Sequence, residues 1–114
     1  MPHGVAHVVL FSPKETVAPA QRDEFLRAFA AAIAAVPEIE RVRVGRRLVA
    51  DRPYEQLGPS FEFIAILEFA SAAALRGYLE HPAHDALAHA FYLTLDRALA
   101  GDFVLEDDVR SLDV

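Results

Sequence analysis

The chain contains no cysteine, so disulfides, thiolate nucleophiles, iron–sulfur clusters and cysteine-ligated zinc are excluded. It also lacks any apolar run approaching the roughly 20 residues of a membrane-spanning helix. The first residues show no basic segment followed by an apolar one, which is the pattern of a secretory signal. We therefore expect a cytoplasmic protein that does not enter a membrane.

Positive charge is scarce as well, because 17 Asp and Glu outnumber 11 Lys and Arg and leave a net charge of −6. Such a field repels phosphate backbones, so nucleic acid is not an expected partner. A local run of arginines at positions 41, 43, 46 and 47 is more typical of a solvated face, or of interface ion pairs, than of an anion site.

The chain has no glycine-rich phosphate loop, nucleophile elbow, internal repeat or flexible linker. With 54% hydrophobic residues, its 114 residues can build one core, which predicts a single domain over 1–114.

The hydrophobic periodicity predicts an alternation of strands and helices. Strands are expected over 5–11, 39–49, 61–69 and 102–106, with an exposed loop over 51–60. Helices are expected over 19–36, from Ser71 to a break at Pro82, and from Pro82 through an inner stripe of Leu87, Phe91 and Leu95. This β-α-β-β-α-(α)-β order is typical of an α+β, ferredoxin-like protomer, in which helices cover one face of a four-stranded antiparallel sheet.

Two of the predicted strands are apolar on both faces. Val8 and Leu10 in the first strand, and Ile64 and Ile66 in the third, lie on the face that the helices would leave uncovered. A large exposed apolar patch marks an interaction surface. The pattern therefore favours a homodimer formed through the sheet faces, and the alternative is that loops or the C-terminal tail cover the face within one chain.

The segment from Tyr78 to His84 carries the most chemistry. Tyr78 follows Leu75 on an apolar stripe, and His84 precedes Leu87 by one helical turn, so both rings face the core. A buried imidazole can act as a general base, and a phenol can donate a hydrogen bond to an enolate oxygen. The pair therefore suits proton abstraction beside a carbonyl, with the alternative that both rings are ordinary core packing.

The same segment contains side chains that could ligate a metal ion. His81 and Asp85 are four residues apart and could share a helix face, with His84 and His89 nearby. Pro82 interrupts that helix, and no compact three-ligand motif is present. We therefore predict no metal and no cofactor.

Several of these residues resemble the stress-responsive dimeric α+β barrel (Dabb) family. The resemblance is carried by the opening His7-Val8-Val9-Leu10-Phe11, by Phe69-Ala70-Ser71, and by His81-Pro82-Ala83-His84, and it spans nearly the whole chain. It implies a ferredoxin-like protomer whose sheet joins that of a second protomer to form a barrel.

One plant branch of the family contains polyketide cyclases of the olivetolic acid type, and the resemblance to that branch implies candidate roles. The tyrosine and histidine that perform an intramolecular aldol cyclisation there match Tyr78 and His84, and His7 matches a pocket histidine. Phe63 replaces a third-strand pocket histidine of that branch, which makes the cavity more apolar. The full set expected to line a ligand pocket is His7, Val9, Phe11, Phe25, Leu26, Phe29, Phe63, His81 and Phe91.

These observations predict a stress-responsive A/B barrel protein whose pocket takes a small apolar carbonyl or aromatic ligand. Cyclase-like acid–base chemistry by Tyr78 and His84 is one hypothesis, and whether the protein is an enzyme is left open. The alternatives are a non-catalytic ligand-binding or structural dimer and a cofactor-independent monooxygenase-like barrel.

Overall fold

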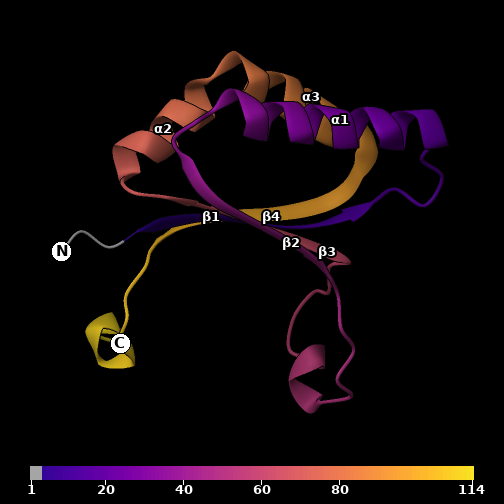
Figure 1. Cartoon of the computed structure of the whole chain (residues 1–114). Coiled ribbons are helices and arrows are strands. Elements are labelled where there is room, and N and C mark those ends of the chain that lie inside the picture. The colour runs from indigo at the N-terminus through magenta and orange to yellow at the C-terminus, as the bar shows by residue number, and fades with distance from the viewer. Residues whose placement is uncertain (1–3) are drawn as a thin grey trace.

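A computed structural model describes residues 4–114. Figure 1 shows three helices lying over one face of a sheet, with the C-terminal tail and the loop after the second strand projecting on the other side. The elements are β1 (Val5–Pro13), α1 (Pro19–Ala35), β2 (Ile39–Arg46), β3 (Phe63–Phe69), α2 (Ala72–Glu80), α3 (Pro82–Thr94) and β4 (Leu95–Val104), with short 3-10 turns at Pro53–Gln56 and Val109–Leu112.

The sheet is antiparallel, with the strand order β2-β3-β1-β4. β1 is central and pairs along its length with β3 on one side and β4 on the other, which makes it the most buried strand. The predicted α+β ferredoxin-like architecture is confirmed. The register places alternate residues of β1 against the helices, among them His7 and Phe11, and the residues between them on the outer face.

Local sequence signals set the helix ends. Pro19 occupies the first turn of α1, where its missing N–H costs nothing. The Ser71 hydroxyl accepts a hydrogen bond from the Ala74 N–H at 3.1 Å and caps α2. His81 ends α2 and starts α3, and its Nδ1 accepts from the Ala83 N–H at 3.0 Å. Pro82 therefore breaks one helix and opens the next, as predicted.

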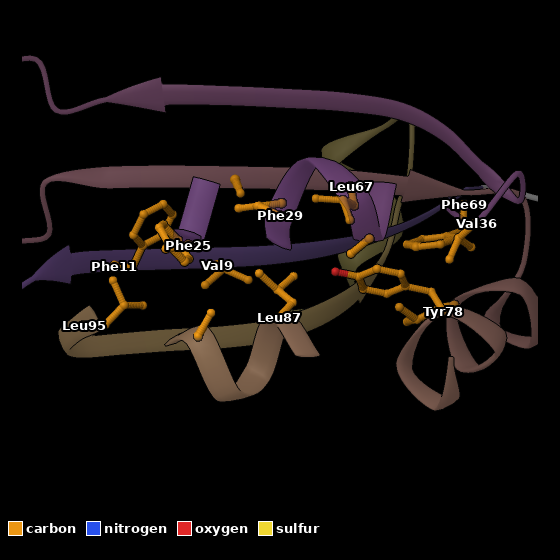
Figure 2. Close-up of a cluster of buried hydrophobic side chains, with 14 of the residues drawn as sticks. Val9, Phe11, Phe25, Phe29, Val36, Leu67, Phe69, Tyr78, Leu87 and Leu95 are labelled. Carbon is orange, nitrogen blue, oxygen red and sulfur yellow. The ribbon is translucent and has the colours of Figure 1, made fainter. Parts of the chain in front are cut away.

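The core lies between the helices and the sheet. Figure 2 shows it as a continuous layer that runs from Phe11 and Phe25 at one end to Phe69 and Tyr78 at the other. Leu67 and Phe69 of β3 are each 1% exposed. The buried rings contact one another edge-on or tilted, which suits their quadrupoles.

Two strand predictions were wrong by three residues or more at one end, while β1 and β3 differ from their predicted bounds by two. β2 ends at Arg46 rather than at residue 49, and its ladder with β3 ends at the pair of Arg46 and Phe63. β4 begins at Leu95, a residue expected on a helix stripe, and extends over ten residues instead of a short segment at 102–106. The sequence from 95 to 100 has little strand character, but pairing with the whole length of β1 overrides that preference.

The outer face of the sheet is apolar in the middle. In the register, Val8 lies opposite Ile66, and Leu10 lies between Ile64 of β3 and Leu99 of β4. All of these side chains reach the surface: Leu99 is 56% exposed, and the other four are partly buried. The α-helices lie over the opposite face and do not shield this apolar patch.

Candidate functional site

Three rings from three different elements meet at one end of the core. The Tyr78 ring, from α2, lies 5.0 Å from the His84 ring of α3 and 5.9 Å from the His7 ring of β1, measured between centroids. Both contacts are edge-on. We refer to His7, Tyr78 and His84 as the ring cluster. The structure thus brings together three residues that the sequence placed on separate elements.

Tyr78 is the most buried member of the ring cluster, with 2% of its surface exposed. Burial raises the pKa of its phenol to about 12, because the charged phenolate would lose its hydration. The hydroxyl therefore stays protonated at neutral pH and can act only as a hydrogen-bond donor or a weak acceptor. In Figure 2 it points along the core toward the end that holds Val9 and Phe25.

His84 is half-buried rather than largely buried as expected. Its place near the start of α3 leaves one edge of the ring at the surface. Burial lowers its pKa below the usual value, the charge of His7 lowers it further, and Asp85 raises it in part. The neutral imidazole, the form that can accept a proton, is therefore favoured near pH 7.

His7 is anchored by a residue that the sequence reading missed. Its Nδ1 lies 2.5 Å from an Asp102 carboxylate oxygen, and because a carboxylate only accepts, the Nδ1–H is the donor. Asp102 was predicted only as the start of a strand, and the register of β4 against β1 places it opposite His7. No local motif signals this pairing, since the two residues are 95 positions apart.

A cavity of about 600 Å³ opens at the opposite end of the core, between α1 and the sheet. Five of the predicted pocket residues line it: Phe11, Phe25, Leu26, Phe29 and Phe63. Its walls are completed by Pro13, Val44, Gly45, Ile64, Thr94 and two arginines, Arg22 and Arg46. We call this space the cavity.

The other predicted pocket residues lie elsewhere. Val9 is buried in the core, and His81 uses its Nδ1 to cap α3. Phe91 packs behind the cavity wall, 5.1 Å from the Phe25 ring. The ring cluster does not line the cavity either. His7 lies four residues from the cavity residue Phe11 along β1, which separates their backbones by about 13 Å at a rise of about 3.3 Å per residue. The candidate site therefore has two ends, one with titratable rings and one with an aromatic cavity.

Within residues 4–114 no group of three His, Asp or Glu side chains has an arrangement that could hold a metal ion. In the same part of the chain no helix is both long and apolar enough to cross a bilayer.

Comparison with known proteins assigns the chain to a family. Residues 5–105 match the family described as Stress responsive A/B Barrel Domain (Dabb), and the chain belongs to that family. The stress-response A/B barrel domain-containing protein HS1 of Arabidopsis thaliana is 29% identical over 99 residues, covering 87% of each chain.

Solved structures share the fold. A dimeric ferredoxin-like protein of unknown function from Thermobifida fusca is 25% identical, with a TM-score of 0.70 over 92% of this chain and 93% of that one. The hydroxynitrile lyase of Passiflora edulis has a TM-score of 0.79 over 95% and 98% of the two chains, at 18% identity. At that identity the likeness to the lyase shows the fold alone.

Proposed function

We propose that this protein is a homodimer that binds a small, mainly apolar compound in the cavity. The observation that carries the proposal is the cavity itself, whose volume of about 600 Å³ is that of a small-molecule site and whose wall is built from four phenylalanines. A core packed only for stability leaves few voids larger than a water molecule. Phenylalanine faces suit an aromatic or alkyl group that leaves water on binding.

The binding proposal is tested with a neutral aromatic probe, 4-phenylbutan-1-ol, titrated into the ¹⁵N-labelled protein. We expect backbone shifts confined to β1, β2, β3 and α1 around the cavity. Val44→Trp places a large ring at the cavity wall on a position that is 69% exposed, and should abolish those shifts. Leu48→Trp, on an 85% exposed position outside the cavity, is the matched control. Binding that survives Val44→Trp unchanged would contradict the cavity as the site.

The dimer is proposed from the outer face of the sheet. The apolar rows around Val8, Leu10 and Ile66 would be costly to leave in water, and the Thermobifida fusca protein of the same fold is described as dimeric. Ile66→Lys puts a charge at the centre of the face and should give a monomer in analytical ultracentrifugation. Leu57→Lys, on an 86% exposed loop position, should leave the mass unchanged. A wild-type protein that is monomeric at micromolar concentration would contradict the dimer.

A second candidate function, proton transfer beside a carbonyl, is supported by the 5.0 Å contact between Tyr78 and His84. The lowered pKa of His84 suits a base, and the raised pKa of Tyr78 keeps a proton available for an enolate oxygen. In this reaction His84 takes the proton from the α-carbon, and the Tyr78 O–H donates a hydrogen bond to the oxygen on which negative charge develops.

Exchange of the α-protons of 4-phenylbutan-2-one in D₂O, followed by NMR, tests this second candidate. General acid–base groups contribute about 10²- to 10⁴-fold, so His84→Gln and Tyr78→Phe should each slow the protein-dependent exchange by about that factor. His89→Gln, an exposed histidine on the same helix, is the control. Equal exchange rates in all four proteins would leave the ligand-binding function standing and remove the catalytic one.

A further inference from the structure

The cavity is apolar in its walls but carries two like charges. Arg22 reaches it from the first turns of α1, and Arg46 from the last position of β2. The register pairs Arg46 with Phe63, which in turn pairs with Phe11, so this arginine shares the helix-facing row of two cavity rings. Two other members of the arginine run, Arg41 and Arg43, lie instead on the outer face, where Arg41 approaches Glu68.

Neither cavity arginine forms an ion pair with any of residues 4–114. In the part of the chain that the structure describes, no carboxylate lies within 4.0 Å of the guanidinium of Arg22 or Arg46. Glu62 lines the adjoining groove together with Arg46 but forms no ion pair with it. Two unpaired guanidiniums on one aromatic cavity favour an anionic group, and their planar donor forks match a carboxylate.

One residue of the cavity wall carries a buried hydroxyl. Thr94 is 1% exposed and lines the cavity, and its Oγ1 has no hydrogen-bond partner among the described residues. A buried hydroxyl without a partner is destabilising, and such groups are uncommon in folded proteins. Because this oxygen has almost no accessible surface, a ligand in the cavity does not reach it, and the preference for an acid rests on the two arginines.

We propose that the cavity binds a small organic acid, with its apolar body among the phenylalanines and its carboxylate at Arg22 and Arg46. This inference rests on the proposed binding function and narrows the ligand to a carboxylate. Because the chain as a whole is acidic, an acid finds little attraction elsewhere on its surface, and the two arginines supply the selectivity.

The experiment compares two probes of nearly the same shape, 4-phenylbutanoate and 4-phenylbutan-1-ol, by calorimetry at pH 7 and low salt. An exposed ion pair contributes at most about fivefold in affinity, so two arginines should favour the acid by up to roughly 25-fold. Raising the salt concentration should weaken binding of the acid and leave that of the alcohol unchanged.

Variants assign the preference to its residues. Arg22→Gln and Arg46→Gln should each reduce the affinity for the acid about fivefold and leave the alcohol unaffected. Arg27→Gln removes an exposed arginine from the same helix as Arg22, outside the cavity, and is the matched control.

The outcomes separate this inference from the proposed function. A preference for the acid that is lost in the two cavity variants and kept in Arg27→Gln supports the inference. Equal affinity for acid and alcohol would overturn it and leave the binding function in place. Binding of neither probe would overturn both.

Discussion

The unpartnered Thr94 hydroxyl allows a stability prediction whose sign is unusual for a core substitution. Thr94→Val replaces the hydroxyl with a methyl group of similar size on a side chain that is 1% exposed. The wild-type hydroxyl is taken out of water without a hydrogen bond in return, which costs about 1–3 kcal/mol in proteins. Valine has nearly the same helix propensity as threonine, so no opposing cost arises in the last turn of α3.

We therefore expect the variant to be more stable than the wild type by about 1 kcal/mol, the lower end of that range. For a domain of this size, this corresponds to a rise in Tm of about 4 °C. Urea denaturation followed by circular dichroism measures the change, and the denaturant slope should stay constant because the surface exposed on unfolding is the same.

Thr16→Val provides the control, since Thr16 is exposed in the loop between β1 and α1 and its change should stay within about 0.5 kcal/mol. A Thr94→Val protein that is less stable than the wild type would refute the reasoning, because it would mean that the hydroxyl has a partner in the native state.

Three further predictions concern the ring cluster. The pKa of folded His84 lies below its ordinary value of 6.5, so the histidine of the unfolded chain binds a proton first as the pH falls. The free energy of unfolding should therefore decrease below about pH 6.5. His84→Gln should remove the part of this decrease that is due to His84. An NMR titration in which His84 protonates above pH 6.5 would contradict this. Ultraviolet titration should show a tyrosine that ionises only near pH 12, if the fold survives, and Tyr78→Phe should abolish that late phase. Asp102→Ala should destabilise the Nδ1–H tautomer of His7, which imidazole ¹⁵N shifts report. It should lower the free energy of unfolding by at most about 1 kcal/mol, because the carboxylate is 44% exposed. Unchanged ¹⁵N shifts would count against the pairing of His7 with Asp102.

The local elements of this protein follow from its sequence. Short apolar runs predict β1 and β3. Pro19, Ser71 and Pro82 predict where helices begin, because capping and proline geometry act within a few residues. The apolar character of both faces of β1 and β3 was also evident, since side chains alternate along a strand regardless of its partners.

The site depended on contacts between distant segments. The spacing of Tyr78 and His84 predicted that both face the core, but only the packing of α2 and α3 against β1 brought them beside His7. Asp102 entered the site through the β4 register, which in turn required strand pairing to override a weak local preference over 95–100.

The separation of the ring cluster from the cavity was likewise a tertiary result. Phe11 and His7 face the same side of β1, so the sequence suggested one shared pocket. At the His7 end the rings of α2 and α3 contact one another and β1, whereas the cavity lies at the Phe11 end, where Arg46 joins from β2. Periodicity assigns a residue to a face, but whether that face is filled or hollow depends on the volumes of side chains from other elements, which no local pattern specifies.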